Sequence, residues 1–177
     1  MDHADYLVDL VDEHGAAIGS KPRRDIQKKA DLYHTVFVLL RTPDNRLILS
    51  EIPARHDLPN LYAGRLAATA ATIRRHQETS EEAAKRAASS ELRLAPDALR
   101  LTNLDDSYRV TDGYRQYVSV YVATHDVPAD FNHTDIKRLA LFTRDELDEA
   151  IRTDAEAFAP TFRVIWQTYA DSLLAAA

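Results

Sequence analysis

The feature that most constrains the fold is one strongly helical segment inside a chain that is otherwise patterned for strands. Residues 80–92 carry two glutamates, Glu81 and Glu82, in the first turn, and either Thr79 or Ser80 makes a good N-cap. Helix formers continue the segment until Pro96 ends the region. We therefore predict a single central helix with strand-forming sequence on both sides of it.

The segments around this helix are rich in β-branched and aromatic residues. Residues 33–40 read YHTVFVLL, which is typical of a buried strand, and residues 46–52 return as its hairpin partner after a Thr-Pro-Asp-Asn turn. The other predicted strands are residues 6–11, 16–18, 66–73, 99–108, 114–124 and 138–142, and residues 21–30 are predicted to be a loop or a short helix after Pro22.

Two helices are predicted near the C-terminus. Thr143 precedes an acidic first turn and caps the first of them. Residues 158–174 repeat apolar side chains at three- and four-residue steps, which indicates an amphipathic helix. This order of elements predicts an α/β fold in which a mixed β-sheet lies between helices, an α/β/α sandwich.

Length and composition limit the classes of protein to consider. The 177 residues suit a single domain, which we divide into a hairpin extension (1–30), a core (31–155) and a C-terminal helix (157–175). The absence of cysteine excludes a disulfide, a thiolate metal site and a cysteine nucleophile. The net charge of −6 disfavours nucleic acid as a partner. With no membrane-spanning run and no signal-peptide pattern, we expect a cytoplasmic protein.

The region from Thr72 to Leu94 resembles the Nudix box, G-x5-E-x7-R-E-U-x-E-E-x-G-U, in which U is aliphatic. Glu78 stands at the first Glu position, Arg86 at the Arg position and Glu91 at the last Glu position. The flanking segments YLVDLVDEHGAAIGSKPRRDI, LPNLYAGRLAATAA and EAFAPTFRVIWQ resemble the isopentenyl-diphosphate-isomerase-like branch of the Nudix hydrolase superfamily. The resemblance covers nearly all of the chain and implies a Nudix-type α/β/α sandwich.

The sequence departs from the family pattern at the metal ligands. In the family, three glutamates on one helical face hold Mg²⁺ or Mn²⁺, which binds and neutralises a diphosphate. Ala87 and Ser90 replace two of these glutamates, and only Glu91 remains. We therefore expect no standard metal cofactor, and Mg²⁺ or Mn²⁺ binding that is weak at most. The resemblance also implies that Glu78 and Arg86 keep their structural pairing.

The isomerase chemistry of that branch is not expected either. His34 matches one metal-binding histidine of the branch. Ala71 and Ile73 occupy the positions of its catalytic cysteine and of a further histidine. Arg115 and Tyr117 fall where its paired glutamates would be. The resemblance therefore implies a related fold without the family's isomerase mechanism.

Basic and aromatic side chains supply the candidate ligand contacts. Guanidinium groups bind phosphate by bidentate hydrogen bonds, and an aromatic ring can stack on a base or cover a prenyl chain. The substrate-binding candidates are Arg55, Arg65, Arg74, Arg75, His34 and Tyr117, and a second basic patch comprises Arg23, Arg24, Lys28 and Lys29. Each candidate also has an alternative interpretation. The arginines and lysines could lie in solvated loops, His34 could be a core histidine with its hydrogen bonds satisfied, and Tyr117 could belong to a packed sheet face. Glu91 is either a catalytic base or residual metal ligand, or a solvated helix residue.

Two functions remain open at this level. The first is a protein that binds a phosphorylated or diphosphate small molecule without standard metal-dependent hydrolysis. The second is an atypical enzyme, a hydrolase, isomerase or lyase, that acts on a nucleoside or prenyl diphosphate. A homodimer or another protein partner is a further possibility that the sequence leaves open.

Overall fold

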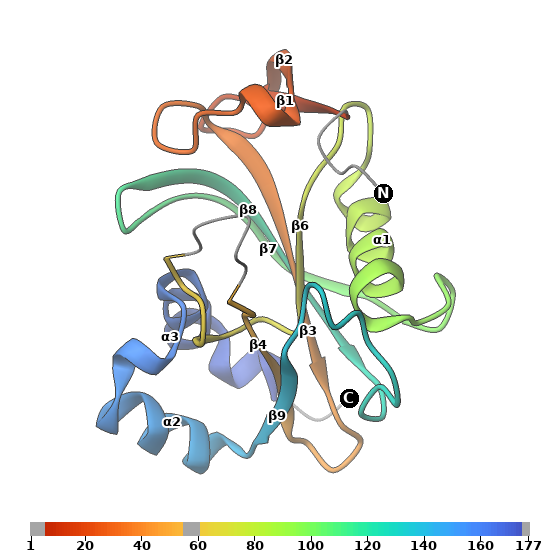
Figure 1. Ribbon diagram of the computed structural model, residues 1–177, viewed down its shortest axis with the longest axis vertical. Coiled ribbons are helices and arrows are strands. Elements are labelled where there is room, and N and C mark those ends of the chain that lie inside the picture. The colour runs from red at the N-terminus through yellow and green to blue at the C-terminus, as the bar shows by residue number, and fades with distance from the viewer. Residues whose placement is uncertain (1–5, 55–60, 175–177) are drawn as a thin grey trace.

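The computed structural model describes residues 6–54 and 61–174, and Figure 1 shows its elements. The strands are β1 (Leu7–Val11), β2 (Ala17–Pro22), β3 (Tyr33–Arg41), β4 (Leu47–Glu51), β5 (Leu66–Ala67), β6 (Ala70–Ile73), β7 (Thr102–Thr111), β8 (Tyr114–Thr124) and β9 (Arg138–Phe142). The helices are α1 (Ser80–Leu92), α2 (Arg144–Thr153) and α3 (Pro160–Leu173), with short 3-10 turns at Arg23–Asp25 and Ala155–Ala157.

The strands form one mixed sheet organised around the long central strand β3. β3 pairs in parallel with β8 and antiparallel with β1, β4 and β6. β7 continues the sheet beyond β8, while β5 and β9 pair with β4, and β2 extends it beyond β1 (Figure 1). Helix α1 lies on one face, and α2 and α3 lie on the other. The predicted α/β/α sandwich with a mixed sheet is confirmed.

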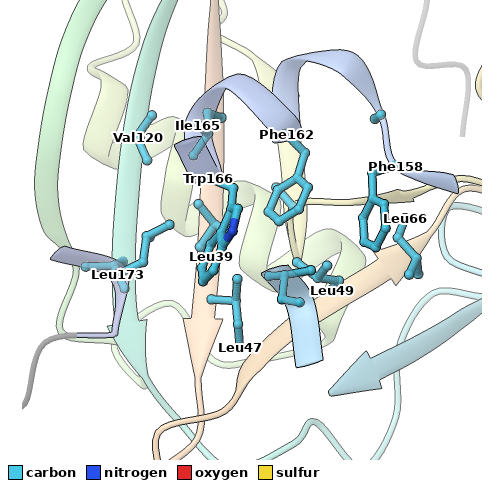
Figure 2. Packing of buried hydrophobic residues seen from close by; sticks show 14 of the residues in the cluster. Leu39, Leu47, Leu49, Leu66, Val120, Phe158, Phe162, Ile165, Trp166 and Leu173 are labelled. Atoms are coloured by element: carbon cyan, nitrogen blue, oxygen red, sulfur yellow. The ribbon is translucent and has the colours of Figure 1, made fainter. Parts of the chain in front are cut away.

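Alternate residues of β3 serve two different cores. Val36, Val38 and Leu40 pack with buried alanines of α1, whereas Leu39 faces the cluster beneath α3. Figure 2 shows this second cluster, in which Phe162, Ile165 and Trp166 of α3 lie over side chains from β3, β4 and β8. The predicted apolar stripe of the last helix is therefore core.

The predicted strand at 66–73 is two strands, and this corrects the sequence interpretation. β5 pairs with β4 and β6 pairs with β3, so the chain changes partner at Ala68 and Thr69. The buried Thr69 hydroxyl makes the change possible, because it donates to the Ile48 carbonyl and accepts from the Leu40 amide at 2.8 Å. At this position a side chain therefore takes the place of hydrogen bonds between strand backbones. No local sequence pattern could predict this replacement.

Other boundaries also differ from the prediction. The strand predicted at 99–108 is shifted to Thr102–Thr111, because β7 pairs with β8 all the way to a tight turn at Asp112 and Gly113, both of which have positive φ. The short strand predicted at 16–18 extends to Pro22. The last helix begins at Pro160 and ends at Leu173, inside the predicted 157–175, because Pro160 takes the first helical turn after a 3-10 turn.

Candidate functional site

The loop before α1 is fastened to the helix by one ion pair. Arg86 Nε lies 2.7 Å from Glu78 Oε1, and Arg86 Nη2 lies 2.8 Å from Glu78 Oε2. Arg86 also donates to the Thr72 hydroxyl and to the Ile73 carbonyl, at 2.9 and 3.0 Å. The Arg75 amide donates to Glu78 Oε2 at 2.8 Å. Both partners are largely buried, so this network fixes the loop against β6 and α1.

The start of α1 is set by a capping box at Thr79, one of the two N-cap residues that the sequence predicted. Thr79 accepts from the Glu82 amide, and the Glu82 carboxylate accepts from the Thr79 amide at 2.8 Å. The helix ends at Leu92, and the C-cap residue Arg93 takes a left-handed conformation with φ of 53°. A glycine normally serves this position with less strain. Between these two ends, residues 87, 90 and 91 lie on one face of the helix.

The three positions on that face differ in exposure. Ala87 is fully buried against the sheet, Ser90 is exposed, and Glu91 is partly buried in the last turn. The Ser90 hydroxyl makes only a long bond to the Ala87 carbonyl of its own helix, at 3.4 Å. Ala87 is therefore part of the core, and Glu91 is the one carboxylate among positions 87, 90 and 91.

Glu91 lies between the edge strand β6 and the loop that follows β8. Its Oε2 accepts from the Ala71 amide at 3.4 Å, and its own carbonyl accepts from the Asn132 amide at 2.7 Å. Burial raises the pKa of Glu91 to about 8; the Asp135 charge acts in the same direction, and the Ala71 amide and Arg86 oppose it. The side chain is therefore mostly protonated at neutral pH.

Metal-ligating side chains do not gather around Glu91. Within residues 6–54 and 61–174, no group of three or more His, Cys, Asp or Glu side chains is placed to hold a metal ion. Asp135 is the nearby acid that raises the Glu91 pKa, and it accepts from Asn132 Nδ2 at 2.6 Å. The possible metal ligands among positions 87, 90 and 91 are thus one carboxyl group and one serine hydroxyl.

A second polar cluster lies at the start of β3, on the sheet face that carries α1. The buried His34 places Nε2 2.6 Å from Ser119 Oγ, and Ser119 in turn hydrogen-bonds the Asp106 carboxylate. The Tyr117 ring meets His34 edge-on with ring centroids 5.0 Å apart. Burial and the nearby Arg74 charge lower the pKa of His34 to about 4, against the opposing effect of Asp106.

Arg74 connects this cluster to β1. Its amide donates to the His34 carbonyl at 2.9 Å, and its Nη2 lies 3.8 Å from the buried carboxylate of Asp9. His76 Nδ1 lies closer to the same carboxylate, at 2.6 Å. We call Asp9, His34, Arg74, Asp106, Tyr117 and Ser119 the His34 cluster. Arg74 follows Ala71 by three residues of extended chain, so it lies about 10 Å from the Ala71 amide that contacts Glu91.

The remaining predicted contact residues lie elsewhere. Arg75 stacks on Tyr6, with Cζ 4.6 Å from the ring centroid, which holds β1 against the loop before α1. Arg65 pairs with Glu156 at 3.0 Å and stacks on Tyr62, away from Arg74. Arg55 lies outside the described residues. The structure therefore brings together His34, Tyr117 and Arg74, and separates them from Arg65 and from Glu91.

Sequence reasoning missed three members of the His34 cluster. Asp9 interrupts the apolar run LVDLV, and Ser119 interrupts YVSVYV, so a polar residue inside a buried strand was the available signal. Asp106 carries no such signal, because β7 is polar along most of its length.

Two surface pockets lie away from both sites. A pocket of about 370 Å³ lies between the start of α2 and the end of α3, where Arg144 and Asp171 line it. A pocket of about 320 Å³ lies beside β1 and includes Leu10, Ile18 and Arg115. Neither pocket includes Glu91 or His34.

No helix among the described residues is both long and apolar enough to cross a membrane.

Solved structures with the same architecture identify the fold. A protein of Deinococcus radiodurans superimposes with a TM-score of 0.74 at 22% identity, over 92% of this chain and 99% of that chain. A MutT protein of Methanosarcina mazei gives 0.62 at 10% identity, over 80% and 94%. A Nudix hydrolase of M. smegmatis gives 0.56 at 19% identity, over 93% and 92%.

At these identities the likeness shows the fold alone: the chain has the Nudix fold. It matches no family model and no curated protein.

Proposed function

We propose that this protein binds a phosphorylated small molecule and lacks the metal-dependent hydrolysis of Nudix enzymes. The observation that carries the proposal is the donor set on α1. Glu91 is the one carboxyl group among positions 87, 90 and 91, where the Nudix pattern has three glutamates. Ala87 is sealed in the core, so a carboxylate could not stand there without repacking the helix against the sheet.

These residues do not fit a divalent cation. Mg²⁺ and Mn²⁺ prefer several oxygen ligands, most of them anionic or water. The pKa of Glu91, which burial raises to about 8, keeps a proton on the carboxyl group that a metal would have to displace. Ser90 adds only a neutral hydroxyl. The described part of the chain offers no larger set of ligands around this face.

A protonated Glu91 suits an anionic ligand better than it suits a cation. With its pKa raised to about 8 by burial, Glu91 is neutral at neutral pH and does not repel a phosphate. In that form it can also donate a hydrogen bond to a phosphate oxygen. The proposed ligand therefore needs no metal to approach this end of α1.

Cations for a phosphate are present in the basic patch that follows β2. Burial and the positive charge of Arg23 lower the pKa of Lys28, and no acidic side chain contributes to that shift. An anion bound between these two groups would relieve their repulsion. This supports a phosphorylated ligand.

The alternative is an atypical enzyme that acts on a diphosphate. One observation favours it, because a carboxyl group with a pKa near 8 is suited to general acid–base catalysis at neutral pH. Charge neutralisation without a metal would then need a cation from outside the α1 face, because Arg74 lies about 10 Å from the Glu91 contact and Arg75 stacks on Tyr6. The two functions differ in whether Glu91 accelerates a reaction or only contacts a ligand.

The test is an incubation with a panel of nucleoside and prenyl diphosphates in the presence of Mg²⁺ or Mn²⁺, with binding followed in parallel by calorimetry. We expect saturable binding of a phosphorylated compound and no turnover above the uncatalysed rate. Robust turnover that is lost in Glu91→Gln would reject the binding function and support the alternative. A useful control is Glu149→Gln on the exposed side of α2, far from either site.

A further inference from the structure

The hydrogen-bond chain from Asp106 through Ser119 to His34 has a fixed direction. A carboxylate only accepts hydrogen bonds, so the single hydroxyl hydrogen of Ser119 is committed to Asp106. The 2.6 Å contact between Ser119 Oγ and His34 Nε2 then needs a hydrogen on Nε2. The exposed Asp106 therefore selects the ring tautomer of the buried His34 through the serine between them.

The other ring nitrogen is left as a bare acceptor. A neutral imidazole carries one hydrogen, so Nδ1 presents a lone pair when Nε2 is protonated. Burial and the Arg74 charge disfavour the doubly protonated ring. Nδ1 is buried and has no hydrogen-bond partner among the described residues. Buried acceptors are nearly always paired in native proteins, so this lone pair points to a group that is yet to be identified.

Two unpaired polar atoms, His34 Nδ1 and Arg74 Nε, belong to residues that face each other across neighbouring segments of the sheet. Six buried side-chain nitrogen or oxygen atoms have no partner within the described ranges, and four of them belong to two adjoining pairs of residues. These pairs are His34 with Thr35 and Arg74 with Arg75. The Arg74 amide donates to the His34 carbonyl, and the register Thr35↔Ile73 makes Arg74 the antiparallel neighbour of His34. The side chains of His34 and Arg74 therefore point to the same face of the sheet.

The two unpaired nitrogens on that face are chemically complementary to one group. His34 Nδ1 accepts a hydrogen bond, and Arg74 Nε–H donates one. A hydroxyl oxygen that reaches both nitrogens would donate to the first and accept from the second. A bare phosphate oxygen could satisfy only the arginine, and an ammonium group could satisfy only the histidine.

Arg74 is also free to exchange its present partner. Its contact with Asp9 is long, at 3.8 Å, whereas His76 Nδ1 lies 2.6 Å from that carboxylate and the Gln77 amide lies 3.4 Å from it. Asp9 therefore keeps hydrogen bonds when Arg74 moves. The Arg74 side chain is 17% exposed, so an incoming anion can reach its guanidinium group.

We propose that His34 Nδ1 and Arg74 form a subsite that recognises a hydroxyl group carried by an anionic small molecule. The anionic half of this ligand rests on the proposed function, whereas the hydroxyl recognition is carried by the His34 cluster itself. The ligand class is a hydroxylated phosphate ester, in which the hydroxyl bridges the two nitrogens and the phosphate takes the outer nitrogens of Arg74.

The first test reads the tautomer directly. Nitrogen-15 spectra of histidine-labelled protein at neutral pH should show His34 with its hydrogen on Nε2. Asp106→Ala, at an exposed position, removes the acceptor that commits the Ser119 hydroxyl, so a population with the hydrogen on Nδ1 should appear. A hydrogen on Nδ1 in the unaltered protein, or a spectrum that Asp106→Ala leaves unchanged, would overturn the assignment of the acceptor.

The second test uses matched probes, glycerol 3-phosphate and propyl phosphate, followed by calorimetry and by the His34 Nδ1 resonance. We expect glycerol 3-phosphate to bind at least about tenfold more tightly and to be the one that moves the resonance. Arg74→Met should abolish the difference, whereas Arg163→Met, which removes an arginine paired with Glu156, should keep it.

The outcomes of this test separate the two proposals. Equal binding of both probes with no change at Nδ1 would overturn the subsite and leave the proposed function standing, with an ordered water as the occupant. No binding of either probe would overturn the subsite, while the panel of diphosphates decides the proposed function independently.

Discussion

Arg86 and Glu78 form a bidentate ion pair across eight residues, with Nε–Oε1 and Nη2–Oε2 contacts of 2.7 and 2.8 Å. The pair joins the loop before α1 to the middle of the helix, and the remaining guanidinium nitrogen donates to Thr72 on β6. Three elements thus meet at one partly buried arginine. Its role is structural, since neither side chain contacts Glu91 through a hydrogen bond in the structure.

Replacing Arg86 by methionine should therefore destabilise the fold. The change leaves the Glu78 carboxylate, which is 14% exposed, without its counter-ion and removes two further hydrogen bonds. We expect a loss of about 2–4 kcal/mol in the free energy of unfolding, measured by urea denaturation. Lys85→Met is the matched control, because its pairing with Glu81 is on the helix surface, and it should leave the midpoint unchanged. Equal effects of the two changes would show that the Arg86 network is not a structural anchor.

The pair illustrates what sequence could predict. Motif spacing placed Glu78 and Arg86, and residue type placed the helix N-cap at Thr79 or Ser80, because both features depend on residues that are close in the chain. The Asp9–Arg74 and His34–Ser119 contacts join segments that are far apart in sequence. Their partners could not be predicted, because strand order and register decide which side chains meet.

The same distinction explains the errors in element boundaries. The apolar run 66–73 reads as one strand, but Thr69 makes two hydrogen bonds to other strands and divides it. The candidate arginines were chosen for their charge and for their positions in the family pattern, and the structure gives Arg65 and Arg75 partners in Glu156 and Tyr6. A basic residue in a loop predicts a ligand contact only when no acid or ring of the same chain lies within reach.

The raised pKa of Glu91 predicts a distinctive pH dependence of stability. Its folded value, about 8, lies above the ordinary value of 4.5, so the folded state binds the proton more tightly than the unfolded state does. This contribution is fully present below about pH 4.5 and is lost as the pH rises through about 8. Glu91→Gln should remove that loss and be more stable than the unaltered protein by about 1–3 kcal/mol near pH 9. Unfolding curves for the two proteins that stay parallel from about pH 5 to 9 would contradict the assignment.

Glu51 should give the opposite pH dependence. Lys137 donates to this buried carboxylate at 2.7 Å and lowers the pKa of Glu51, with Arg138 adding to the effect and burial opposing it. The stabilisation is therefore present above the ordinary carboxyl pKa and is lost as the pH falls through the lowered value.

Glu51→Gln should cost about 1–2 kcal/mol at neutral pH, because Lys137 and Arg138 are exposed and can be solvated once the carboxylate is gone. The variant should also show a shallower loss of stability below about pH 4 in acid-unfolding experiments. An acid limb as steep as that of the unaltered protein would mean that Glu51 is not responsible for it.

The two replaced positions on α1 should tolerate glutamate very differently. Ala87 is fully buried between α1 and the sheet, so Ala87→Glu would place a carboxyl group in the core and should cost more than about 3 kcal/mol. Ser90 is exposed, and Ser90→Glu should fold normally. Thermal unfolding of both variants checks this, and an Ala87→Glu protein as stable as the Ser90→Glu protein would show that position 87 can open toward solvent.

A calorimetric titration of Mn²⁺ into the unaltered protein tests the central claim most directly. Because Glu91 is the one carboxyl group among positions 87, 90 and 91 and burial raises its pKa to about 8, we predict no saturable binding in the unaltered protein and none in Glu91→Gln. A saturable site of one ion per chain that disappears in Glu91→Gln would contradict the account.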